Sequence, residues 1–228
     1  LSIEETESSN KDVEKNRWAG ITTKPEIIDS MLKKASNSAN AIIIVPDNAV
    51  KEQLREKYGD EFVKRVTTIY DSKGLEWDYV VLFNMLSYNN ERFIEMINKE
   101  AKHSTLHRMI FNQYYVGCTR ALSCFSVLEE NLLPEIVNSV IYKNLQQITL
   151  GTADLFIQTS IDPSSWLAEA NRLFDAGLYE LAFTAFEKSF STSTLIYPVF
   201  IAELSIFSAD SPVITAETTL LDLSSVNS

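Results

Sequence analysis

The segment Ala41–Val45 (AIIIV) constrains the fold of this chain more than any other segment. Its apolar, mostly β-branched residues are uninterrupted, a pattern typical of a strand buried on both faces of a parallel sheet. Comparable apolar segments at residues 66–70, 79–83 and 124–128 predict three further strands. Helical periodicity is found around them, at residues 25–36, 48–58, 91–101 and 105–122. This alternation predicts an α/β fold with a mainly parallel sheet flanked by helices.

The composition excludes several classes of protein. The 228 residues include 31 acidic and 20 basic side chains, so the net charge is −11, and 45% of the residues are hydrophobic. No apolar run approaches the roughly 20 residues of a membrane-spanning helix, and no apolar leader opens the chain. The only cysteines, Cys118 and Cys124, cannot build a disulfide framework or a four-cysteine zinc site. We therefore expect an intracellular protein of a reducing compartment, the cytoplasm or the nucleus, with no membrane partner.

Charge and periodicity together predict how the chain is divided. We expect a flexible lead-in at residues 1–19, the α/β domain at 20–146, an all-helical segment at 147–210 and a loose tail at 211–228. Residues 151–228 carry 10 acidic and 2 basic side chains, so this part is not expected to bind a polyanion. Because the first residue is Leu1 rather than methionine, we expect the chain to be part of a longer protein.

Two common kinds of site are not expected in this sequence. None of the six glycines is followed by lysine, so no G-x-x-x-x-G-K-[ST] loop is present to hold the phosphates of a nucleotide. His103 and His107 have the spacing of two ligands on one helix face, but no carboxylate pattern accompanies them. An ordinary solvated helix face is the better interpretation, and we expect no metal site.

A strand, a tight turn and a second strand are predicted in residues 67–81. Gly74 in the turn lets the backbone approach a ligand closely. We expect Lys73 and Glu76 to lie at the carboxyl end of a strand, where open α/β sheets bind ligands. A surface turn with hydrated charges explains this segment equally well.

A helix is predicted to lead into a strand at residues 115–121 (YVGCTRA). Arg120 would then project from the helix end toward the edge of the sheet. Its planar, permanently charged guanidinium suits a phosphate group. The alternative is a cation that only stabilises the carboxyl end of the helix dipole.

Taken together, residues 68–77 (TIYDSKGLEW) and 115–121 resemble the fifth and sixth motifs of UvrD/Rep-type superfamily 1 helicases, in the family's order. The resemblance covers roughly residues 20–130 and implies a RecA-like fold, the second motor domain of an ATP-dependent DNA helicase or translocase. In that family the first RecA-like domain lies upstream and holds most of the ATP and its Mg²⁺. The resemblance therefore implies single-stranded DNA and an upstream motor domain as partners, and a chain that is inactive alone.

The resemblance also implies roles for individual residues. Arg120 would be catalytic, as an arginine finger that reaches the γ-phosphate. Glu76 would contact the ribose of the nucleotide. Lys73 and Gly74 lie beside it and, with Arg120, complete the group of residues expected to bind the nucleotide. Thr68, Tyr70 and Ser72 would face the single-stranded DNA.

Residues 166–190 (WLAEANRLFDAGLYELAFTAFEKSF) resemble one tetratricopeptide (TPR) repeat. The small residues Ala170 and Ala182 would let two helices approach, and Gly177 would make the turn. An ordinary helical hairpin is an equal alternative. We expect a protein partner, where there is one, to bind through residues 163–210. The rival function is therefore a non-catalytic interaction module, built on a degenerate helicase fold with TPR-like helices.

Overall fold

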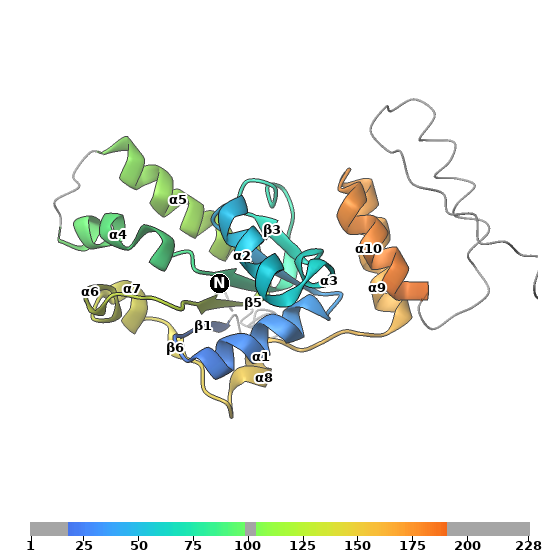
Figure 1. The fold of residues 1–228 in the computed structure, drawn as a ribbon, viewed down its shortest axis with the longest axis horizontal. Coiled ribbons are helices and arrows are strands. Elements are labelled where there is room, and N and C mark those ends of the chain that lie inside the picture. The colour runs from blue at the N-terminus through green and yellow to red at the C-terminus, as the bar shows by residue number, and fades with distance from the viewer. Residues whose placement is uncertain (1–17, 99–103, 191–228) are drawn as a thin grey trace, which may run out of the picture. The chain divides into compact units, whose positions relative to one another are not determined.

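The computed structural model describes residues 18–98 and 104–190 of the chain (Figure 1). Two compact units are distinguished, residues 1–189 and residues 190–228. The helices and strands described below belong to the first unit, apart from the last residue of the final helix.

A parallel sheet organises this unit. Among the described residues six strands form one sheet in the order β3-β2-β4-β5-β1-β6, and every neighbouring pair is parallel. The strands are β1 (Trp18–Thr22), β2 (Ala41–Val45), β3 (Val66–Thr68), β4 (Trp77–Phe83), β5 (Ala121–Leu128) and β6 (Gln146–Gln147). The predicted α/β class with a parallel sheet is confirmed.

Helices flank the sheet on both faces. The N-terminal helices are α1 (Pro25–Ser36), α2 (Asn48–Tyr58) and α3 (Asp60–Val63). They are followed by the 3₁₀ helix η1 (Ser87–Asn89), α4 (Asn90–Ile97), α5 (Thr105–Thr119), α6 (Pro134–Val137), α7 (Val140–Lys143) and α8 (Ala153–Phe156). Buried residues of α1, α2, α3 and α8 pack against alternate residues of β2 and β4, such as Ile43 and Val81. On the other face α5 packs against β4 and β5, and α4 packs against α5.

Local sequence signals explain where the first helices begin and end. Pro25 occupies the first turn of α1, where a missing N–H costs nothing. The Asp47 side chain caps α2 by accepting a hydrogen bond of 3.1 Å from the Val50 amide. Gly59 ends α2 at a φ of 89°, a left-handed conformation that favours glycine.

Some predicted boundaries differ from the structure. β3 ends at Thr68 rather than at residue 70, and α5 ends at Thr119 rather than at residue 122. Trp18 and Ala19, expected in the lead-in, begin β1, which pairs with β5 and β6. Residues 147–157, expected in the helical segment, supply Phe156 and Ile157 to the core of the sheet. The expected tail at 211–228 lies outside the described residues, as do 1–17, 99–103 and 191–210.

The last two helices of the described ranges are α9 (Pro163–Asp175) and α10 (Tyr179–Phe190), which form a helical hairpin (Figure 1). Gly177 has a φ of 77°, and the Leu178 amide donates to the Leu173 carbonyl at 2.9 Å to close the turn. The inner face of the hairpin is buried and consists of Trp166, Ala170, Leu173, Ala182, Ala185 and Phe186. In the described ranges no helix has both the length and the apolar character needed to cross a bilayer.

Candidate functional site

The two motif-like segments meet in the structure. The Trp77 amide donates a hydrogen bond of 2.9 Å to the Arg120 carbonyl, and Trp77 is paired with Ala121 in the sheet. The Arg120 side chain also donates from Nη1 to the Leu75 carbonyl at 3.4 Å. Residues that are about 45 positions apart in the chain are therefore brought together at the start of β4 and β5.

The position of Glu76 corrects the sequence-based expectation. We expected Lys73 and Glu76 at the carboxyl end of a strand, but Glu76 directly precedes β4 and lies at the amino end of that strand. The reason is topological: β3 and β4 are parallel and both neighbour β2, so the chain must return to the opposite edge between them. Lys73 lies in this returning segment, residues 69–76. The candidate site is thus at the amino-terminal edge of the sheet.

In the turn after β3, polar side chains form hydrogen bonds to other residues of the same turn. The Thr68 hydroxyl donates to the Asp71 carboxylate at 2.7 Å and accepts from the Asp71 amide at 3.2 Å. The Ser72 hydroxyl donates to the Ile69 carbonyl at 2.8 Å. Thr68 and Ser72 are both buried. Their hydroxyls therefore shape the turn rather than present themselves to a ligand.

The remaining residues of the fifth-motif segment are accessible. Tyr70 has 63% of its surface exposed, and its hydroxyl is hydrogen-bonded to the Gln113 side chain of α5. Lys73, Gly74 and Glu76 are exposed as well. Gly74 has a φ of 83° and open space around it, so the backbone can be approached closely there.

The Arg120 guanidinium makes fewer hydrogen bonds than its donors allow. It is partly buried, its Nε is shielded from solvent without a hydrogen-bond partner, and its contact with Leu75 is long. Among the described residues no carboxylate forms an ion pair with it. A guanidinium left with free donors at a sheet edge is suited to bind an anion.

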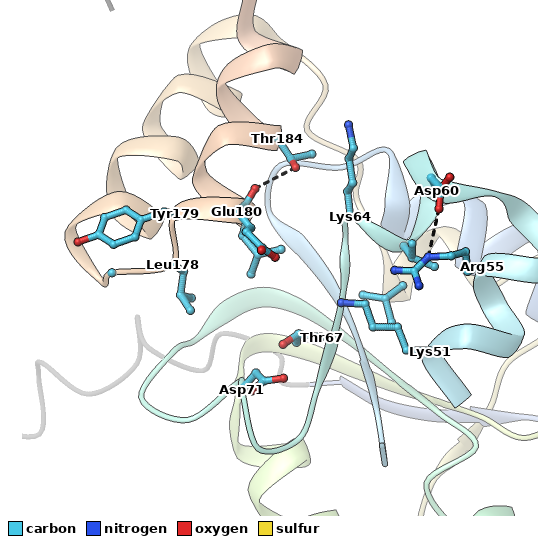
Figure 2. Close-up of a pocket in the computed structure, with 14 residues that line it drawn as sticks. Lys51, Arg55, Asp60, Lys64, Thr67, Asp71, Leu178, Tyr179, Glu180 and Thr184 are labelled. Carbon is cyan, nitrogen blue, oxygen red and sulfur yellow. Dashed lines mark hydrogen bonds and ion pairs between the residues drawn. The ribbon is translucent and has the colours of Figure 1, made fainter. Parts of the chain in front are cut away.

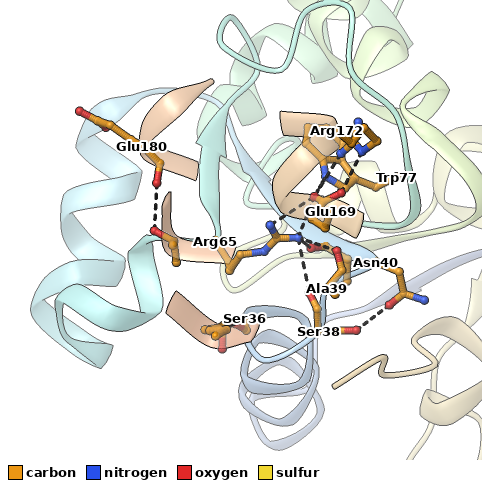
Figure 3. Close-up of polar contacts among 12 residues, drawn as sticks. Ser36, Ser38, Ala39, Asn40, Arg65, Trp77, Glu169, Arg172 and Glu180 are labelled. Atoms are coloured by element: carbon orange, nitrogen blue, oxygen red, sulfur yellow. Dashed lines mark hydrogen bonds and ion pairs between the residues drawn. The ribbon is translucent and has the colours of Figure 1, made fainter. Parts of the chain in front are cut away.

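A buried ionic cluster, which the sequence patterns did not reveal, joins this edge to α9 (Figure 3). Arg65 is fully buried, and its Nη1 lies 3.3 Å from the carboxylate of Glu169. Glu169 also accepts from the Trp77 indole at 2.9 Å and from Arg172 at 2.8 and 3.1 Å. The Arg172 guanidinium lies over the Trp77 ring, 5.3 Å from its centroid. Burial lowers the pKa of Arg65, and the adjacent Glu169 carboxylate opposes that shift.

A cavity of about 350 Å³ lies between this edge and α9. Glu76 and Asp78 line one side, and Ser165 and Arg172 line the other. The hairpin therefore forms one wall of the space next to Glu76.

A second cavity, of about 550 Å³, lies between α2–α3 and the turn of the hairpin (Figure 2). Three basic residues line it, but two are already paired: Arg55 Nε lies 3.1 Å from Asp60, and Lys64 lies 2.7 Å from Glu61. Asp71 and Glu180 offset the remaining charge of Lys51. The charged residues that line the cavity therefore balance, so its charge does not favour a phosphate group.

The described residues include no group of three or more His, Cys, Asp or Glu side chains placed to hold a metal ion. His107 instead pairs with Glu95 of α4 at 2.5 Å. His103 lies outside the described residues. No family model and no curated protein matches this chain.

Proposed function

We propose that this chain is the second, RecA-like motor domain of an ATP-dependent DNA helicase or translocase. The observation that carries the proposal is the position of Arg120. Its guanidinium has free donors, lies at the same edge of the sheet as the exposed Glu76, and is hydrogen-bonded to the carbonyl of the preceding residue, Leu75.

The roles follow from this placement. ATP would bind between this edge and an upstream motor domain, which would hold most of the phosphates and the Mg²⁺ that neutralises their charge. Arg120 would donate to the γ-phosphoryl oxygens as charge builds up in the transition state. The exposed Glu76 carboxylate would accept hydrogen bonds from the ribose hydroxyls, and Lys73 and Gly74 would line the approach.

Tyr70 would contact single-stranded DNA. Its exposed ring offers a stacking surface for a base, and stacking of this kind is tolerant of sequence. Thr68 and Ser72 would act indirectly, because their hydroxyls hold the turn that carries Tyr70.

Arg120→Ala tests the proposal in a protein that contains this chain together with its upstream motor domain. An arginine finger contributes on the order of 10³-fold or more to turnover, whereas a cation at a helix end contributes only about 0.3–1 kcal/mol to stability. We expect DNA-stimulated ATP hydrolysis to fall by that factor with little change in the melting temperature. Arg120→Lys should recover little activity, because lysine lacks the planar fork.

Arg108→Ala is the matched control, since Arg108 is an exposed arginine on α5, the helix that ends at the residue before Arg120. It should leave turnover unchanged. Near-normal hydrolysis by the Arg120→Ala protein would refute the proposed role of this residue and leave the interaction-module function as the better one.

A further inference from the structure

The helical hairpin has an apolar outer face. Leu167 of α9 and Tyr179 and Phe183 of α10 expose 41%, 55% and 50% of their surfaces. Phe174 packs edge-on against Tyr179, with ring centroids 5.4 Å apart. Figure 2 shows the Tyr179 ring directed away from the residues of α2 and α3 that line the cavity. We call Leu167, Phe174, Tyr179 and Phe183 the hairpin face.

The contacts that attach the hairpin to the sheet are made by residues outside the hairpin face. Its residues have helical spacing, seven positions apart in α9 and four in α10, so each helix presents them as one stripe. Different residues attach the hairpin to the sheet, such as Trp166 and Glu169, which are buried against Arg65. Exposed apolar stripes of this kind are typical of surfaces that bind another protein.

The charges around the hairpin face are negative. Asp175, Glu180 and Glu187 are exposed, although Glu180 also lines the cavity beside Lys51 and Glu187 approaches Lys64 at 3.3 Å. The two basic residues of the hairpin are both engaged. Arg172 is bound to Glu169, and Lys188 donates to the Ser36 carbonyl at 2.8 Å. Residues 163–190 carry four acidic and two basic side chains, so the hairpin has a net negative charge.

We propose that the hairpin face binds a basic amphipathic helix of a partner protein, with an apolar stripe flanked by lysine or arginine. An apolar stripe laid against an apolar surface is a common mode of helix recognition, and the flanking positive charges would complement the acidic residues. A second copy of the hairpin face is a poor occupant, because it would bring like charges together. Residues 191–228 are equally poor, since they contain four acidic and no basic side chains. This proposal goes beyond the motor function and does not depend on it.

Fluorescence anisotropy with synthetic peptides tests this proposal on the full chain. The probe is a labelled peptide of leucine and lysine, about five helical turns or roughly 18 residues long, with one apolar stripe. One control peptide replaces every lysine with glutamate, and another has the same composition in an order that breaks the stripe. We expect the first peptide to bind, more weakly as salt is added, and both controls to bind at least about tenfold more weakly.

Variants locate the binding surface. Phe183→Ser should weaken binding of the Leu/Lys peptide by about tenfold or more, and Phe183→Leu should retain it. Leu150→Ser is the matched control, because Leu150 is 71% exposed and lies outside the hairpin. Equal binding of the three peptides, or an equal effect of Phe183→Ser and Leu150→Ser, would overturn the proposal. Self-association of the chain that Phe183→Ser abolishes would also overturn it, in favour of a second copy as the occupant.

Discussion

The indole Nε1 of Trp77 donates a hydrogen bond of 2.9 Å to the carboxylate of Glu169. This bond connects the residue that follows Glu76 to the helical hairpin, across 92 positions of the chain. Glu169 also neutralises the fully buried Arg65. The hairpin is therefore attached to the sheet at the edge where the candidate nucleotide-binding residues lie.

Glu169→Gln should strongly destabilise the fold. The variant leaves the Arg65 guanidinium buried without a compensating charge, and breaking a buried ion pair in this way costs about 3–5 kcal/mol. Urea denaturation monitored by circular dichroism measures the change. Glu187→Gln is the control, since Glu187 forms an exposed ion pair with Lys64, worth about 1 kcal/mol at most. Similar urea midpoints for the two variants would mean that the buried ion pair does not stabilise the fold more than the exposed one.

Glu129 should make the stability depend on pH. It is fully buried, and burial raises its pKa to about 7 from an ordinary value of 4.5. Its carboxylate accepts hydrogen bonds of 2.8 Å from the Leu86 and Ser87 amides, and it interacts electrostatically with Tyr114. Because the folded-state pKa lies above the unfolded one, the folded state binds the proton more tightly. Stability should therefore fall as the pH rises through this window, by about 3 kcal/mol in all.

Glu129→Gln isolates this effect, because a neutral amide resembles the protonated carboxyl group. The difference in unfolding free energy between the unchanged chain and the variant should shift between about pH 5 and pH 8. Glu130→Gln, at the exposed neighbouring position, should show no such shift. Parallel pH profiles for all three proteins would show that Glu129 does not titrate in this range.

Gly20→Ala should destabilise the sheet. A Cβ at this position would lie 2.5 Å from the Phe156 ring and 2.7 Å from Ile148, which are both buried. Overpacking of this kind costs about 1–3 kcal/mol. Gly151→Ala meets no atom within 4 Å and serves as the control. Thermal unfolding compares the two, and an unchanged melting temperature for Gly20→Ala would show that β1 and α8 can move apart at little cost.

The chain alone should not hydrolyse ATP and should bind single-stranded DNA weakly. It has no phosphate-binding loop, and its net charge of −11 repels a polyanion. A coupled phosphate-release assay and a DNA titration at two salt concentrations measure these properties. Turnover that Glu76→Gln abolishes would show that the nucleotide site is complete within this chain. Tight, salt-resistant binding would contradict the expectation that the negative charge of the chain repels DNA.

Several elements could be predicted from the sequence because their signals are local. β2 and β4 are buried on both faces, so their apolar residues form continuous runs. α1 could be predicted from its amphipathic period and the proline in its first turn. α2 could be predicted because a capping aspartate and a terminating glycine are encoded next to it. The two motif-like segments were also recognisable, since each consists of adjacent residues.

The tertiary structure alone decided where these segments lie. β1 and β6 are short and depend on hydrogen bonds to neighbouring strands, so their own residues carry little signal. Glu76 lies at the amino-terminal edge because β3 and β4 are parallel neighbours of β2, and strand order is a property of the whole sheet. Arg65 and Glu169 are 104 positions apart, and nothing in either local sequence indicates the other. Burial alone makes their pairing necessary, because a charge removed from water must find its counter-charge inside the fold.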